Sequence, residues 1–145
     1  MIDRLQKLRQ SRSGASAVEF ALVMPAFLLM LFGIVEFGRL FWTSHALHET
    51  AIATARCMGI PQLECEDGGA YSTSKVITFA ETKAAGWFVN LDPASIALDH
   101  NASCYGLAGF SQVNLTYQFT TALPGLLTSL AGGTGLVAQA CYTNQ

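Results

Sequence analysis

The longest apolar stretch of the chain lies near its N-terminus. Phe20–Val35, FALVMPAFLLMLFGIV, contains no charged residue and is followed by Glu36 and Arg39. These 16 residues would make a helix of about 24 Å, which is shorter than the roughly 30 Å hydrocarbon core of a membrane. A helix that starts at Ala15 is long enough, and it places Glu19 at or near one membrane edge. The pattern therefore predicts a transmembrane helix with one acidic residue close to its start.

The helical pattern continues beyond this span. Pro25 is the one helix breaker between residues 15 and 57, and membrane helices tolerate a proline kink. Gly59 and Pro61 then provide a stop signal. We therefore expect an N-terminal helix over residues 15–58, with its membrane span at about 15–42.

The outer end of the expected span carries charged, aromatic and imidazole side chains. Glu36 and Arg39 are three residues apart on one helix face, where they either pair at the membrane edge or each contact water. Phe41 and Trp42 are typical of an interfacial aromatic belt. The run HALHE at 45–49 lacks the i, i+4 histidine spacing of a zinc protease helix, so we expect a solvated face there and no metal site.

Residues 59–145 show strand patterns typical of a small outer head. In QVNLTYQF at 112–119, apolar and polar residues alternate without exception, which predicts a strand with one buried face and one wet face. Residues 95–100 and 135–142 are weaker strand candidates, and ALPGLLTSL at 122–130 predicts a short apolar loop or helical turn. We expect an antiparallel sheet of about three strands.

One further helix is expected in the head. Between Val76 and Phe88 the apolar residues recur at helical spacing, and NLDP at 90–93 ends the pattern. This predicts an amphipathic helix that faces the core and includes Trp87 as a core residue. The fold class is therefore α+β: a long N-terminal transmembrane helix, then a small disulfide-stapled antiparallel sheet with a helix packed on it.

The cysteines are even in number and all lie beyond the apolar stretch, where an exported portion of the chain would oxidise them. They are Cys57, Cys65, Cys104 and Cys141. Four cysteines allow three connectivities, and the sequence alone does not choose among them. The pairing that we expect is 57 with 65, around a short loop, and 104 with 141, between two strands. The wide spacings without a C-x-x-C motif argue against a metal site.

Composition and missing motifs narrow the possible functions. The chain is 51% hydrophobic and 12% charged, and its formal net charge of −2 leaves no basic patch for nucleic acid. It has no nucleophile elbow, phosphate loop, dinucleotide fingerprint or pair of catalytic acids, and GGTG at 132–135 predicts a hairpin turn. Glu64, Glu66 and Asp67 beside two glycines fit a solvated loop better than a calcium site. We therefore expect no enzymatic activity, no cofactor and no bound metal.

The flanks of the apolar stretch predict its orientation. The first 12 residues carry four basic side chains against one acidic side chain, so the positive-inside rule places this end in the cytoplasm and the head outside. Three interpretations remain open. The segment is a signal anchor with Glu19 at the interface, a cleavable secretory signal, which the long apolar run suits poorly, or a basic leader, 1–14, that is removed after Gly14. The third makes Ala15 the new N-terminus and Glu19 its fifth residue.

The stretch SGASAVEFALVMPAFLLMLFGIVEFGRLFW carries a family pattern. It resembles the TadE-like family of the tight-adherence pilus systems, in which G-x-x-A-V-E-F-A-L-x-x-P precedes an apolar run, an acidic residue and an arginine. The basic leader and the glutamate at the fifth mature position are also similar to type IV pilin and pseudopilin N-termini. The positions that match the TadE-like pattern are Gly14, Ala17, Val18, Glu19, Phe20, Ala21, Leu22, Pro25, Glu36 and Arg39.

The resemblance implies a processing site and an assembly contact. A prepilin peptidase would cut between Gly14 and Ala15, and Glu19, beside Phe20, would pair with the N-terminal amine of a neighbouring subunit. The chain would then be a minor pilin or pseudopilin-like component of a Flp-type (type IVb) pilus or secretion apparatus, with other pilin subunits and the assembly platform as partners.

The location implied is the inner membrane, with the head periplasmic or extracellular. Incorporation of the subunit into the pilus is a further expectation, and the subunit would serve assembly and surface adhesion. The alternative is an uncleaved single-pass envelope protein whose outer head binds another partner.

Overall fold

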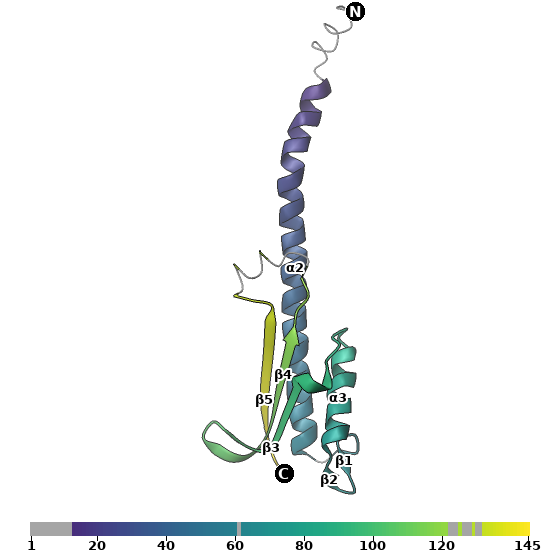
Figure 1. The fold of residues 1–145 in the computed structure, drawn as a ribbon, viewed down its shortest axis with the longest axis vertical. Coiled ribbons are helices and arrows are strands. Elements are labelled where there is room, and N and C mark those ends of the chain that lie inside the picture. Colours follow the sequence, from purple (N-terminus) through teal and green to yellow (C-terminus); the bar gives the residue numbers. More distant parts are fainter. Residues whose placement is uncertain (1–12, 61, 122–124, 126–128, 130–131) are drawn as a thin grey trace, which may run out of the picture. The chain divides into compact units, whose positions relative to one another are not determined.

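A computed structural model of the protein describes residues 13–60, 62–121, 125, 129 and 132–145 (Figure 1). The expected basic leader therefore lies outside the described residues apart from its last two positions. The apolar loop expected at 122–130 also lies outside them, except for Gly125 and Ser129, which are helical. The chain forms two compact units, Met1–Phe37 and Gly38–Gln145.

Helix α2 (Ser13–Gly59) is the long N-terminal helix that the sequence predicts, and it has Pro25 in its interior. Its last part, from Gly38 onward, belongs to the second compact unit. There the buried side chains of α2 are mostly small, including Ala46, Ala51 and Ala55 at 0% exposure. Small side chains let neighbouring elements approach the helix backbone closely, so this part of α2 forms one wall of the core of the head.

The predicted three-stranded antiparallel sheet is confirmed. Its strands are β3 (Ile96–Cys104), β4 (Leu107–Gln118) and β5 (Gly135–Thr143), with β4 in the centre. The register pairs Leu98 with Val113 and Val113 with Ala140. All three strands are longer than their sequence patterns. Strand β3 continues to pair with β4 past irregularities between Asp99 and Ala102 and between Ala102 and Cys104.

The alternation expected in β4 is also confirmed. Val113 and Leu115 are fully buried, Phe119 just after the strand is 5% exposed, and Tyr117 is half-buried against the core. The polar residues between them are half-buried or exposed. One face of the sheet therefore packs into the core that also contains residues of α2 and α3.

Helix α3 (Thr73–Ala85) is the predicted amphipathic helix, and its buried residues are Val76, Ala80 and Ala84. The expectation that the pattern runs to Phe88 is wrong. The helix ends at Ala85, and Phe88 is 96% exposed with a φ of 62°, so it is no part of the core. Trp87, in contrast, is half-buried against the core as expected.

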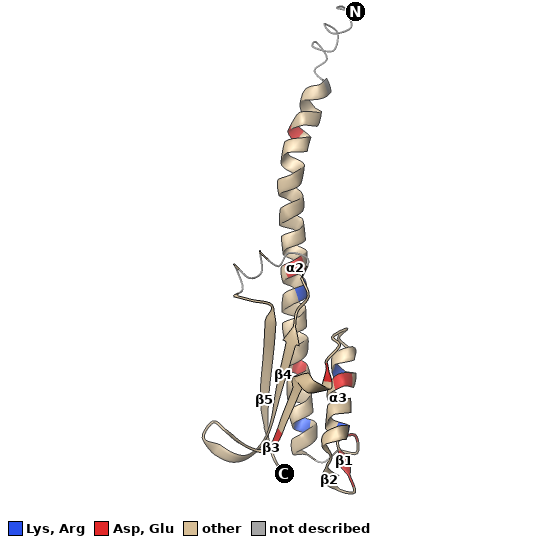
Figure 2. Ribbon diagram, viewed as in Figure 1, with Lys and Arg blue, Asp and Glu red and all other residues tan. Residues whose placement is uncertain are grey.

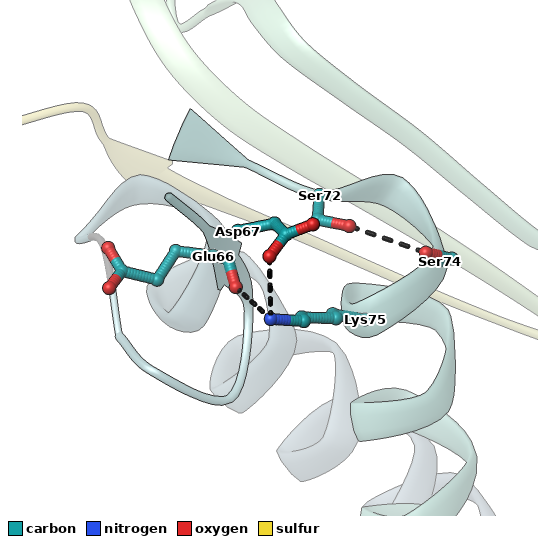
Figure 3. Close-up of polar contacts among 5 residues, drawn as sticks. All are labelled: Glu66, Asp67, Ser72, Ser74 and Lys75. Carbon is teal, nitrogen blue, oxygen red and sulfur yellow. Dashed lines mark hydrogen bonds and ion pairs between the residues drawn. The ribbon is translucent and has the colours of Figure 1, made fainter. Parts of the chain in front are cut away.

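A small hairpin precedes α3 where the sequence suggests only a solvated acidic loop. Strands β1 (Glu66–Asp67) and β2 (Ala70–Tyr71) pair across Gly68 and Gly69, whose φ angles of 63° and 83° are those of a tight left-handed turn. Lys75 of α3 donates to the Glu66 carbonyl at 2.6 Å and pairs with the Asp67 carboxylate at 3.3 Å (Figure 3). The acidic side chain of Asp67 thus faces a lysine.

Candidate membrane and assembly segment

The N-terminal part of α2 exposes almost all of its apolar surface. Between Val18 and Val35 the large hydrophobic side chains are 36% to 75% exposed. A contiguous apolar surface of this kind is unfavourable in water, whereas a helix in lipid satisfies its backbone internally and gains from such side chains. By length and composition this helix is able to cross a membrane.

Glu19 is the one charged residue between Ser13 and Val35, and in Figure 2 the N-terminal part of α2 is almost entirely tan. Its side chain is exposed, as is that of Phe20 beside it. It is the seventh residue of α2, beyond the first turn, so the helix dipole contributes little to it in the uncleaved chain. The described residues form no ion pair with Glu19. Its carboxylate is therefore open to a partner from outside the chain.

Gly14 and Ala15, the residues of the expected processing site, lie in the first turn of α2 and are exposed. A Cβ atom added at Gly14 would meet nothing within 4 Å. The first turn of a helix frays readily because its N–H groups lack partners within the helix. This bond is sterically open to a peptidase, and its cleavage stays a prediction.

The two charged residues after the apolar run have different surroundings. Glu36 is only 6% exposed, which is at odds with a carboxylate that faces water. The guanidinium carbon of Arg39 lies 5.3 Å from the ring centroid of Phe119, within reach of a cation–π interaction. Their pairing at the membrane edge stays a prediction.

Trp42 makes a contact that the sequence did not indicate. Its Nε1 donates a hydrogen bond to the Trp87 carbonyl at 3.3 Å, and the two rings meet edge to face with centroids 5.5 Å apart. The His45 ring also lies 6.1 Å from the Trp87 ring. The loop after α3 is thereby fixed to α2. The histidines and the glutamate at 45–49 are exposed, which confirms the solvated face expected there.

The structure brings a serine and a histidine together in the head. Nδ1 of His100 lies 2.9 Å from Oγ of Ser111, and this hydroxyl donates to Oδ1 of Asn144 at 2.6 Å. The hydroxyl therefore has a hydrogen-bond partner on each side, and the donor in its bond with His100 depends on the tautomer of the ring. Ser111 is also fully buried, and Asn144 donates to the His100 carbonyl. The cluster secures the C-terminal end of the chain.

Both expected disulfides are present. Cys57–Cys65 joins the end of α2 to the segment before β1, with Cα atoms 5.9 Å apart. Cys104–Cys141 joins β3 to β5, the two outer strands of the sheet, with Cα atoms 6.5 Å apart. Within the described residues, no group of three or more histidine, cysteine, aspartate or glutamate side chains is arranged to hold a metal ion.

Comparison with known families matches the N-terminal helix. A family model described as TadE-like protein covers residues 14–56, which include the pattern from Gly14 to Arg39 and continue nearly to the end of α2. No curated protein and no solved structure matches the chain. Over residues 14–56 the chain is therefore similar to the TadE-like family.

Proposed function

We propose that this protein is a minor pilin or pseudopilin-like component of a tight-adherence pilus or secretion apparatus. The TadE-like match over residues 14–56 indicates involvement in such a pilus. The observation that carries the finer assignment is a lone exposed carboxylate, Glu19, in the N-terminal part of α2, where the large apolar side chains from Val18 to Val35 are all exposed. This part of α2 therefore offers apolar surface to lipid and to other helices, and the carboxylate of Glu19 on it requires a positively charged partner.

The proposed role of Glu19 follows from the cost of its charge. A carboxylate in the hydrocarbon region costs several kcal/mol unless it is paired. Removal of the leader after Gly14 creates an ammonium group at Ala15, at the same end of the helix. Because no described residue pairs with Glu19, the ammonium of a neighbouring subunit is the partner that we assign to it. Phe20, 63% exposed, would pack at the same contact.

The proposed orientation places the N-terminus in the cytoplasm, the helix in the inner membrane and the head on the outer side. The basic residues before the helix favour this orientation, and the two disulfides of the head suit an oxidising compartment. Prepilin peptidase, other pilin subunits and the assembly platform would be the partners. The head would act in assembly and adhesion without enzymatic activity.

The N-terminal mass of protein extracted from membranes tests the processing step. With the peptidase present, we expect a mature chain that begins at Ala15, because Gly14 is sterically open. In cells that lack the peptidase, the leader should remain. A chain that keeps its leader when the peptidase is present would instead support an uncleaved envelope protein with an outward binding head.

A substitution tests the assembly contact. We expect Glu19→Ala to abolish incorporation into pili and surface adhesion while the protein accumulates and is cleaved normally, because only the intersubunit pair is lost. Glu49→Ala is a matched control, since Glu49 is an exposed glutamate of the same helix within the head. Normal piliation of the Glu19→Ala strain would refute the pairing role.

A further inference from the structure

Phe88 has the largest exposed fraction among the large hydrophobic side chains that the structure describes, at 96%. It lies in the loop that follows α3, between Trp87, which is half-buried, and Val89, which is 3% exposed. Its neighbours are thus held by the head while its own ring projects away from it. Such a side chain contributes no hydrophobic burial to the stability of its own domain.

The backbone at Phe88 is equally unusual. The N–H of Val89 bonds to the carbonyl of Ala84 at 3.0 Å, and the N–H of Phe88 bonds to that of Ala85 at 3.0 Å. These two bonds form a Schellman motif, in which the left-handed position is normally glycine. Phe88 holds this position with a φ of 62°. A bulky residue in this conformation is strained, and here the strain is not offset by burial, which points to a contact outside the domain.

The loop lies at the Gly38 end of the second compact unit. Within the second compact unit, α3 runs antiparallel to α2, so its C-terminal end lies toward Gly38 (Figure 1). The hydrogen bond from Trp42 to the Trp87 carbonyl fixes the loop at the level of Trp42. Trp42 and Phe41 are themselves 54% and 72% exposed. Three exposed aromatic side chains therefore belong to this end of the head: Phe41, Trp42 and Phe88.

The distance along α2 places Trp42 close to the outer surface of the lipid headgroup layer. If the span begins at Ala15, about 20 residues cross the hydrocarbon core and the span ends near Val35. Trp42 follows seven positions later, or about 10 Å of helix, just beyond a headgroup layer of about 5–8 Å and within reach of it for an aromatic side chain. Residues 84–91, AAGWFVNL, contain no charged side chain, so this loop can enter that region without desolvating an ion.

We propose that the loop after α3 is a second membrane contact of this protein, in which Phe88 inserts into the headgroup layer beside Phe41 and Trp42. The head would then be held against the outer leaflet before assembly. The inference rests on the proposed membrane span. A lipid interface accepts single aromatic side chains, whereas a stable protein interface needs on the order of 1,000 Å² of buried surface, far more than one projecting ring supplies.

Photo-crosslinking in the full chain tests this contact. The protein, reconstituted in nanodiscs of phosphatidylethanolamine and phosphatidylglycerol, carries p-benzoylphenylalanine in place of Phe88, Tyr105 or Phe27, one position at a time. Tyr105 is the matched control, because it is 95% exposed with a φ of 55° in the β3–β4 turn. Phe27 reports on the membrane span itself. We expect lipid adducts by mass spectrometry at positions 27 and 88 and none at 105.

Each other outcome overturns the inference in a distinguishable way. Lipid adducts at position 27 alone would leave the membrane span intact and refute the second contact. Adducts at neither 27 nor 88 would refute both. Covalent dimers at position 88 would assign the site to a second copy of the chain, and equal adducts at 88 and 105 would show non-specific labelling.

A measurement on the unmodified chain guards against misfolding of the labelled variants. The chain has 2 tryptophans, Trp42 and Trp87, which contact each other. We expect lipids brominated close to the headgroups to quench their fluorescence. Fluorescence that these lipids leave unchanged would place the loop in water and contradict the proposal.

Discussion

At the scale of single residues, close contacts leave no room for a side chain at Gly59. A Cβ atom there would lie 3.0 Å from the Thr143 carbonyl oxygen and 3.0 Å from Cδ1 of Tyr142. We expect Gly59→Ala to lower the free energy of unfolding by about 1–3 kcal/mol, because a backbone oxygen cannot move aside easily. Urea unfolding of the chain in detergent, followed by near-UV circular dichroism, measures it. Gly38→Ala is the control: nothing lies within 4 Å of its Cβ, so it should be neutral or slightly stabilising. Equal effects of both would refute the steric explanation.

Phe88 leads to the opposite expectation at the same scale. Phe88→Gly should leave the free energy of unfolding of the head unchanged or raise it by up to about 1 kcal/mol, because relief of the left-handed strain offsets the greater freedom of glycine in the unfolded chain. The same unfolding assay measures it, with Tyr105→Gly as a second strained position. A loss of stability at Phe88→Gly would mean that the ring packs within the head.

At the scale of elements, the two disulfides should contribute unequally. Cys57–Cys65 closes a separation of 8 residues and Cys104–Cys141 one of 37. By loop entropy, replacing the first pair with serines should cost about 2–3 kcal/mol and replacing the second about 4 kcal/mol. Urea unfolding of the two double variants under the same conditions measures the order. A larger loss for the shorter loop would show that strain or residual structure outweighs loop entropy.

Elements with strong local periodicity were predictable from the sequence, and those set by backbone geometry were not. The alternation of apolar and polar residues in β4 is compatible only with a strand that buries one face, and the long apolar run of α2 indicates a helix long enough to span a membrane. The end of α3 was misjudged because Phe88 continues the helical spacing while its backbone has already turned left-handed. The β1–β2 hairpin was missed because its strands are two residues each, too short for any periodicity, although the glycine pair at 68–69 is a turn signal.

At the scale of the whole molecule, the candidate site was predictable only where the chain is locally distinctive. Gly14 and Glu19 stand out because a glycine and a lone acid precede a long apolar run. The contact between Trp42 and Trp87 joins residues 45 positions apart, and no local sequence pattern predicts it. It depends on where α3 packs, which is a property of the assembled core.

The orientation of the whole chain gives the last prediction. Replacing Arg4, Lys7, Arg9 and Arg12 with glutamine removes the basic side chains that favour the proposed cytoplasmic N-terminus, so a fraction of the chains should insert with the head inside. The head reports its own location, because its two disulfides form only in an oxidising compartment.

Intact cells are first quenched with acid, and their free thiols are then alkylated. The fraction of chains that gain four alkyl groups is the fraction inserted with the head inside. The control, Arg56→Gln with Lys83→Gln, removes two exposed basic side chains of the head and should leave every cysteine oxidised, since charges far from the membrane contribute little to orientation. If the glutamine variant stays fully oxidised and inserted, the charge of the leader does not set the orientation, and the helix and its head must be oriented by another signal.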